Sequence, residues 1–263
     1  MSAVGVGVGG LVGVGPAAWG VLAAPLGLAA IAAAAFTAGG NALNDIFDCE
    51  TDRINHPDRP LASGRLTLGA ARIFAASTFA LAALFALFIN RPALGIVGLN
   101  VLLMVSYEAW LKARGAAGNL VIAYLVGSLF LFAGVSVFGG AFDPLIRTGI
   151  LAALAFLATL GREITKDIED IRGDVDRRTL PQQIGAKRSG AVAAFVLVLG
   201  VALSALPLYL GVLGIGYAIL VVPADGMFIY AALHSAANPA RSQRVTKYAM
   251  IVALVAFLVG AFL

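Results

Sequence analysis

The sequence predicts an all-α, polytopic membrane protein. Of its 263 residues, 60% are apolar and only 12% are charged, against about 25% charged in an ordinary soluble domain. The mean hydropathy is +0.94, and no charged side chain precedes Asp45. These three observations exclude a soluble globule, and they exclude an intrinsically disordered chain because such chains are poor in apolar residues.

Nine apolar stretches are long enough to be transmembrane helices, each of which needs about 20 residues. We expect them to form one membrane domain over residues 1–263. Prolines fall at or near several of the breaks, where a missing backbone donor does least harm. The predicted spans are 3–21, 24–44, 68–89, 94–111, 118–139, 145–162, 189–209, 212–234 and 246–263.

The basic residues support this count and predict the orientation. All except Arg91 and Arg147 fall in alternate connections between spans, as the positive-inside rule requires for cytoplasmic loops. The N-terminus is therefore predicted to lie in the cytoplasm. The cations are dispersed over short loops, so we expect no nucleic-acid partner. One cysteine and two histidines are too few for a metal cage of those residues.

Eleven of the 14 acidic residues gather in two clusters, one after the second span and one after the sixth. By the predicted topology both clusters lie at the cytoplasmic ends of helices. Glu50 and Asp176 are interpreted as solvated charges. The first cluster is Asp45, Asp48, Glu50, Asp52 and Asp58, and the second is Glu163, Asp167, Glu169, Asp170, Asp174 and Asp176.

The spacing in each cluster places several polar side chains on one helical face. Asn44, Asp48 and Asp52 follow one another at i, i+4 and i+8, with Asp45 at the edge of that face, and the second cluster repeats the pattern at i, i+3 and i+7. Like charges at these spacings repel one another and oppose the helix dipole. A Mg²⁺ ion held by carboxylates, water and substrate phosphate would offset the repulsion. The alternative, merely solvated loop charges, is weakened by the presence of two such clusters.

Nearby basic residues are candidate ligands for a phosphorylated substrate. Lys112, Lys166 and Arg59 each have an ordinary explanation as topology signals. An anionic diphosphate nevertheless needs donors that carboxylates do not supply. Lys112 is the strongest candidate because it is nearly isolated after an apolar helix. By contrast, the cations that follow the eighth span are interpreted as topology charges only; they are Arg241, Arg244 and Lys247.

Two ordered motifs resemble those of the UbiA prenyltransferase superfamily. Residues 44–53, Asn-Asp-Ile-Phe-Asp-Cys-Glu-Thr-Asp-Arg, followed by Asn55 and the segment 58–64, resemble its first motif, NDxxDxxxDxxN...RP. Residues 167–174, Asp-Ile-Glu-Asp-Ile-Arg-Gly-Asp, are similar to its second motif, DxxDxxxD. The resemblance extends over essentially the whole chain. Within the superfamily, residues 40–45, 162–170 and 178–181 are most similar to the archaeal digeranylgeranylglyceryl phosphate synthases.

This resemblance implies a nine-helix bundle with a central cavity that opens sideways to lipid. It also implies Mg²⁺-dependent transfer of a geranylgeranyl group from its diphosphate to the hydroxyl of geranylgeranylglyceryl phosphate, in the cell membrane and facing the cytoplasm, with no obligate protein partner. The implied metal ligands are Asn44, Asp48, Asp52, Asp167, Asp170 and Asp174. Of these, Asp48, Asp52, Asp170 and Asp174 are the expected catalytic residues, and the expected substrate-binding residues are Asn44, Asp45, Arg59, Lys112 and Lys166.

Two other functions remain open from the sequence alone. An aromatic polyprenyltransferase of the same superfamily would attach the chain to a quinone precursor. An ion-coupled or proton-coupled transporter would also use acids within the membrane, but it would place them near the centres of spans rather than at their ends. One departure from the family pattern concerns the first segment, which lacks the usual polar stretch with Arg and Asn; we therefore assign it no substrate contact.

Overall fold

A computed structural model describes residues 2–15, 19–138, 142–171 and 178–263, and in these ranges it contains helices and no strands. The N-terminal half contains α1 (Ser2–Val14), α2 (Trp19–Phe47), α3 (Cys49–Asn55), α4 (Leu68–Ile89), α5 (Arg91–Ser106), the π-helical turn η2 (Tyr107–Leu111) and α6 (Ala116–Ser136). The C-terminal half contains α7 (Asp143–Asp170), α8 (Leu180–Ile184), α9 (Ala186–Leu203), α10 (Leu206–Tyr209), α11 (Ile215–His234) and α12 (Pro239–Gly260).

Each of the nine predicted apolar segments contains a helix. Within the described ranges, eight helical segments are long and apolar enough to cross a membrane, which confirms an all-helical polytopic fold. The exception is α1, whose 13 residues rise only about 20 Å, less than the roughly 30 Å of a bilayer core. The boundary between the first two segments was also placed too late, because α2 already begins at Trp19.

The sixth segment is much longer than the sequence predicts. The expected span ended near residue 162, but α7 continues to Asp170 over 28 residues, or about 42 Å. The helix is therefore longer than the roughly 30 Å hydrocarbon core, and its last two turns contain Asp167 and Asp170 of the second acidic motif. Proline near the start of α7 follows the usual preference for the first helical turn, where its missing N–H removes no hydrogen bond.

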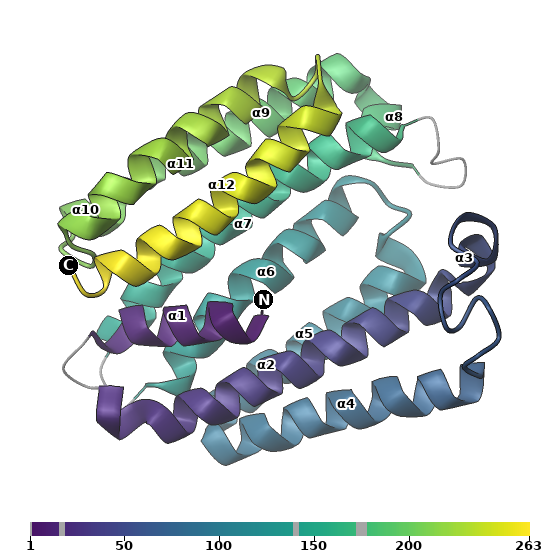
Figure 1. The fold of residues 1–263 in the computed structure, drawn as a ribbon, viewed down its shortest axis with the longest axis horizontal. Helices are drawn as coiled ribbons and strands as arrows, with labels where there is room; N and C mark the ends of the chain where they lie inside the picture. The colour runs from purple at the N-terminus through teal and green to yellow at the C-terminus, as the bar shows by residue number, and fades with distance from the viewer. Residues whose placement is uncertain (1, 16–18, 139–141, 172–177) are drawn as a thin grey trace.

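The helices form two groups that α1 and α6 connect (Figure 1). One buried apolar cluster includes Val6 and Phe132 and joins α1 and α6 to α2, α4 and α5. A second cluster includes Val12 and Phe130 and joins the same two helices to α7, α11 and α12. Because α1 and α6 contribute side chains to both clusters, they hold the two halves of the bundle together.

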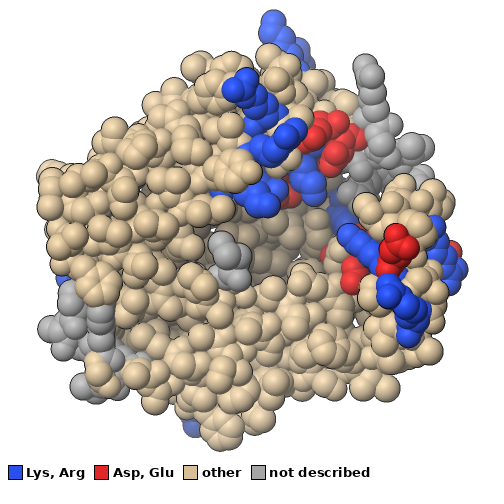
Figure 2. Space-filling view, viewed as in Figure 1, with Lys and Arg blue, Asp and Glu red and all other residues tan. Residues whose placement is uncertain are grey.

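Charged side chains gather at one end of this bundle. In Figure 1, α3 and α8 mark that end, and α2 and α7 both point their C-termini toward it. Figure 2 shows the acidic and most of the basic atoms at the rim of a hollow in the same region, whereas the rest of that face is mostly tan with small blue patches at its edges. The two acidic motifs, more than 100 residues apart in the sequence, therefore lie at the same end of the molecule.

Candidate active site

The first motif lies where the second membrane helix breaks. Helix α2 ends at Phe47, Asp48 occupies the junction, and α3 begins at Cys49. The amide Nδ2 of Asn44 donates a hydrogen bond to Asp48 Oδ2 at 3.1 Å, so these two predicted site residues lie on one face as expected. Helical backbone bonds continue across the junction, from Asp48 N–H to Asn44 O and from Asp52 N–H to Asp48 O. Asp52 on α3 is buried, with only 6% of its surface exposed.

A π-helical turn brings two further charges to Asp48. In η2 the N–H of Lys112 bonds to the carbonyl of Tyr107 at 2.8 Å, and this extra residue in the turn changes the direction of the side chains that follow. Lys112 Nζ then donates to both carboxylate oxygens of Asp48, at 2.8 and 2.7 Å, and to Glu108 Oε2 at 3.1 Å. Asn44 Nδ2 closes the network with a bond to Glu108 Oε1 at 3.0 Å.

Glu108 was not predicted as a site residue. Its side chain is only 1% exposed, and it is one of three acids that lie outside the two acidic clusters. The signal was present, because an ionisable residue within a membrane span normally has a functional or structural partner. Lys112, predicted as a substrate-binding residue, lies against Asp48 of the first motif, and its contact with a substrate stays a prediction.

A second network neutralises the other acids of the first motif. Arg59 Nη1 lies 2.7 Å from Asp52 Oδ2 and 3.3 Å from Asp45 Oδ1. The hydrogen bond to Asp52 raises the pKa of the Arg59 guanidinium above its ordinary value. Arg59 therefore remains charged and holds the loop after α3 against the motif. Asp45 and Asp52 therefore share one cationic partner, Arg59.

The second motif is more open. On α6, Asn119 Nδ2 donates to Asp167 Oδ2 at 2.8 Å, which repeats the Asn–Asp pairing of the first motif. Lys166 and Asp170 are exposed on the last turns of α7. Asp174, also predicted as a ligand, lies outside the described residues. Asp170 forms no ion pair within the described part of the chain.

Gly115 allows the loop after η2 to pack closely against the chain just before α8. Gly115 has a φ of +58°, and a Cβ at this position would lie 2.5 Å from the carbonyl oxygen of Arg178. The N–H of Arg178 bonds to the carbonyl of Ala113 at 3.0 Å. Because only glycine allows this approach, the loop after η2 is fixed to the chain just before α8.

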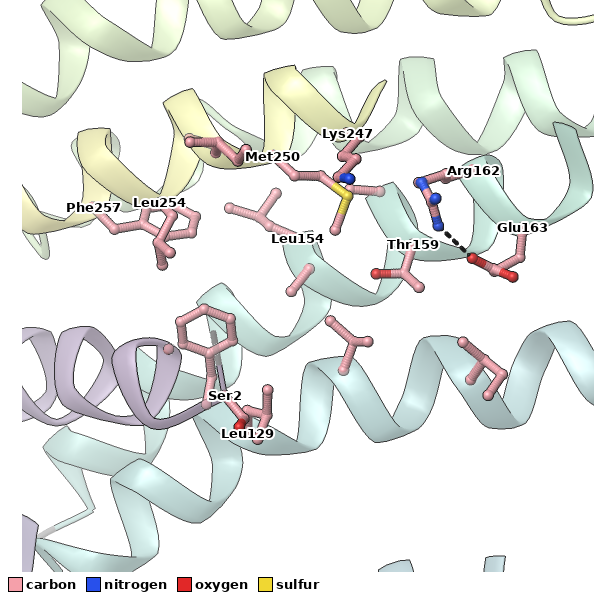
Figure 3. A pocket seen from close by; sticks show the side chains of 18 residues that line it. Ser2, Leu129, Leu154, Thr159, Arg162, Glu163, Lys247, Met250, Leu254 and Phe257 are labelled. Atoms are coloured by element: carbon pink, nitrogen blue, oxygen red, sulfur yellow. Dashed lines mark hydrogen bonds and ion pairs between the residues drawn. The ribbon is translucent and has the colours of Figure 1, made fainter. Parts of the chain in front are cut away.

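An apolar cavity of about 500 Å³ lies between α1, α6, α7 and α12. Its walls include Val126 and Phe130 of α6 and Leu254 of α12, while Ser2 and Gly5 of α1 line one side. Figure 3 shows polar side chains gathered at one end of it. The first helix therefore contributes to the cavity wall, a position that its uncharged sequence did not predict.

The donor atoms at this end of the bundle are compatible with Mg²⁺. Within the described ranges, no three acidic, histidine or cysteine side chains converge to form a protein-only metal cage. Mg²⁺ does not need such a cage, since one or two carboxylates suffice when substrate phosphate and water complete its coordination. Asp167 and the exposed Asp170 offer hard oxygen ligands of this kind, whereas both carboxylate oxygens of Asp48 are bonded to Lys112 and would have to exchange that contact for the ion.

The comparisons with known proteins agree with this arrangement. A model of the UbiA prenyltransferase family matches residues 4–262. The chain is 44% identical to digeranylgeranylglyceryl phosphate synthase of Methanosarcina mazei over 225 residues, 84% of this chain and 77% of that protein. It is 39% identical to the synthase of Natronomonas pharaonis over 259 residues, 97% of this chain and 92% of that one.

Solved structures show the same fold. One, described as giving insights into the biosynthesis of digeranylgeranylglyceryl phosphate synthase in membranes, aligns with a TM-score of 0.82 at 36% identity over 99% of this chain and 92% of that one. A UbiA homologue from Aeropyrum pernix aligns with a TM-score of 0.81 at 21% identity, over 98% and 96% of the two chains. The family match over nearly the whole sequence, together with these relatives, shows that the chain belongs to the UbiA prenyltransferase family.

Proposed function

We propose that this prenyltransferase moves a geranylgeranyl group from geranylgeranyl diphosphate to the free hydroxyl of geranylgeranylglyceryl phosphate. The product contains the second ether bond of archaeal membrane lipids. The observation that carries the proposal is the placement of two Asn–Asp pairs at one end of a bundle that also encloses an apolar cavity. Identities of 39 to 44% to synthases of this name support the same acceptor.

The polar end provides what the diphosphate requires. Mg²⁺, when bound, neutralises the negative charge that develops on the departing diphosphate. Asp48, Asp167 and Asp170 are the described residues that would hold it, and a homologous fold from Archaeoglobus fulgidus, 14% identical, is known bound to GPP and Mg²⁺. Asn44 and Asn119 orient Asp48 and Asp167 through their hydrogen bonds.

Positive side chains complete the binding of the diphosphate. Lys112 is fixed between Asp48 and Glu108, and it can exchange one of these contacts for a phosphate oxygen. Lys166 lies exposed beside Asp167 and adds a second donor. Ionisation breaks the bond between the allylic carbon and the diphosphate oxygen. The acceptor hydroxyl then forms the new carbon–oxygen bond and loses its proton.

The reacting end is proposed to face the cytoplasm. All the basic residues except Arg91 and Arg147 lie in the connections that follow α2, α5, α7 and α11 or in the helix ends that border them, and such regions remain on the cytoplasmic side of a membrane. Both motifs lie at this end. Addition of a membrane-impermeant thiol reagent to a variant with a cysteine in the loop after α11 would test the orientation: labelling from the cytoplasmic side is expected, and labelling from outside would contradict it.

The enzyme assay is direct. Purified protein with Mg²⁺, geranylgeranyl diphosphate and geranylgeranylglyceryl phosphate should yield the doubly alkylated lipid, detected by mass spectrometry. A parallel reaction with a phenolic acid tests the aromatic alternative. Product with the phenolic acid alone would contradict the proposed acceptor. Ion flux in proteoliposomes without release of diphosphate would contradict the transferase function and support transport.

A further inference from the structure

One end of the apolar cavity is polar, and the residues that make it polar lie outside the two aspartate motifs. Thr159, Arg162 and Glu163 of α7 and Lys247 of α12 line it there, and all its other lining residues except Ser2 and Gly5 are apolar side chains. Figure 3 shows Arg162 and Lys247 on the same side as Thr159, with Leu254 and Phe257 toward the opposite end. Neither Arg162 nor Lys247 was expected to do more than set topology.

Two buried polar groups at this end lack a partner. The side-chain oxygen of Thr159 and the Nε of Arg162 are both buried without a hydrogen bond in the described structure. Thr159 is only 4% exposed. A buried donor left unpaired costs free energy, so each such group in a native protein calls for an explanation, for example a catalytic role or a bound water or ion. Both groups belong to side chains that line the cavity, which points to a ligand that accepts hydrogen bonds.

The guanidinium of Arg162 is held in place for this purpose. Its Nη1 lies 2.7 Å from Glu163 Oε1, and its Nη2 donates to Gln243 Oε1 at 3.3 Å. These two contacts occupy the outer nitrogens and fix the plane of the group, so that Nε remains available. Glu163 balances one positive charge, and Lys247 adds a second that has no ion pair among the described residues. The polar end thus has a net positive charge.

The position of this end along α7 separates it from the proposed diphosphate site. Arg162 precedes Asp167 by five residues and Asp170 by eight, which corresponds to about 7 and 12 Å along the helix axis. It therefore lies deeper in the bundle than the acids. From Lys247 to Phe257 the cavity follows ten residues of α12, or about 15 Å, which is enough for much of an extended isoprenoid chain.

Building on the proposed function, we propose that Arg162, Lys247 and Thr159 bind the phosphate of the acceptor lipid, while its hydrocarbon chain occupies the apolar part of the cavity. A phosphate monoester has a charge near −2 and three acceptor oxygens, which match two cations and a hydroxyl without a metal ion. In a glyceryl phosphate the free hydroxyl is on the carbon next to the one that bears the phosphate. Binding the phosphate here directs that hydroxyl toward the acids, where the allylic carbon is released.

Kinetics with both substrates tests the assignment. Lys247→Gln and Thr159→Val are each expected to raise the KM for the acceptor about tenfold, the usual effect of removing one hydrogen bond to a charged group. The KM for geranylgeranyl diphosphate should stay within about twofold of wild type. Lys247→Arg should restore most of the acceptor affinity. Arg244→Gln is the matched control, since Arg244 lies one turn earlier on α12 and is exposed like Lys247, but does not line the cavity.

A second measurement isolates the phosphate. The wild-type enzyme should prefer the phosphorylated acceptor over geranylgeranylglycerol, and Lys247→Gln should reduce that preference about tenfold. Binding of the acceptor without donor or Mg²⁺, measured as the shift in thermal unfolding in detergent, should weaken in the same variant. This binding readout is independent of turnover.

The outcomes distinguish this inference from the proposed function. If wild-type protein makes no doubly alkylated lipid, the proposed function fails and the inference fails with it. If wild type is active but the variants keep a normal KM for the acceptor, only the inference is overturned. An increase in the KM for geranylgeranyl diphosphate instead would also overturn it, because the cavity would then hold the donor.

Discussion

The two acidic motifs share one hydrogen-bond pattern but differ in how their charge is balanced. Each contains an asparagine amide bonded to an aspartate, Asn44 to Asp48 and Asn119 to Asp167. In the first motif, Lys112 and Arg59 pair with the carboxylates. In the second motif the exposed Asp170 has no ion pair within the described residues.

Because of this difference, we expect the paired charges of the first motif to contribute to stability and the exposed carboxylate of the second motif to be available for ligand binding. A buried or partly buried ion pair that loses one partner leaves an uncompensated charge, which costs several kcal/mol. An exposed carboxylate without a partner contributes little to stability and remains available to a cation. Changes in the first motif should therefore affect folding as well as activity, whereas changes in the second should affect activity alone.

The largest effect is expected in the second motif, where Asp170 is exposed. Asp170→Asn should lower kcat/KM by at least about 100-fold, because it removes a charge offered to Mg²⁺, while the free energy of unfolding should change by less than about 0.5 kcal/mol. Product formation by mass spectrometry and thermal unfolding in detergent measure the two. Asp143→Asn, at the opposite end of the same helix, is the control and should leave activity unchanged. A clearly destabilised Asp170→Asn protein would contradict the comparison.

The next largest effect is expected in the first motif, where Lys112 pairs with Asp48 and Glu108. Lys112→Met should destabilise the fold by about 3 kcal/mol, because Glu108, with a side chain 1% exposed, and Asp48 both lose their cation. Denaturant unfolding in micelles measures the change. Adding Glu108→Gln should recover part of the loss, since the double variant no longer leaves two unpaired acids. Unchanged stability in the single variant would show that the network does not support the fold.

A smaller effect concerns the orientation of a ligand. Asn119→Ala removes the hydrogen bond that positions Asp167 and should raise the Mg²⁺ concentration for half-maximal rate about tenfold, as is usual when a partner of a metal ligand is lost. Titration of the reaction rate with Mg²⁺ measures this half-maximal concentration. Asn100→Ala, which loses a comparable bond to Ser128 between α5 and α6, is the control. If both variants shift the titration equally, Asn119 has no special role.

The smallest effect concerns an exposed pair within the first motif. Arg53 and Glu50 form an ion pair at 2.8 Å, but their side chains are 54% and 81% exposed. Arg53→Ala should change the unfolding free energy by less than about 0.5 kcal/mol and leave activity within about twofold of wild type. This agrees with the interpretation of Glu50 as a solvated charge. A large loss of activity would extend the site to this pair.

Much of the fold and part of the site could be predicted from the sequence. Long apolar runs identify membrane helices because the bilayer sets their length, and the described residues confirm the all-helical fold. Lys112 was singled out as a candidate substrate ligand because it is a nearly isolated cation after an apolar helix, and the structure places it against Asp48. The end of α7 could not be predicted in this way, because a helix continues as readily in polar residues once it has been nucleated.

What the sequence determined by itself is the local pattern: which segments are apolar enough to enter lipid, and which acids share a helical face. These depend only on residue type and spacing. The tertiary structure alone decided that Glu108 joins the first motif through a π-helical turn, that α1 lines the cavity, and that Arg162 and Lys247 line the same cavity. These arrangements bring together residues that are far apart in the sequence, and they depend on how the helices pack, which no local spacing encodes.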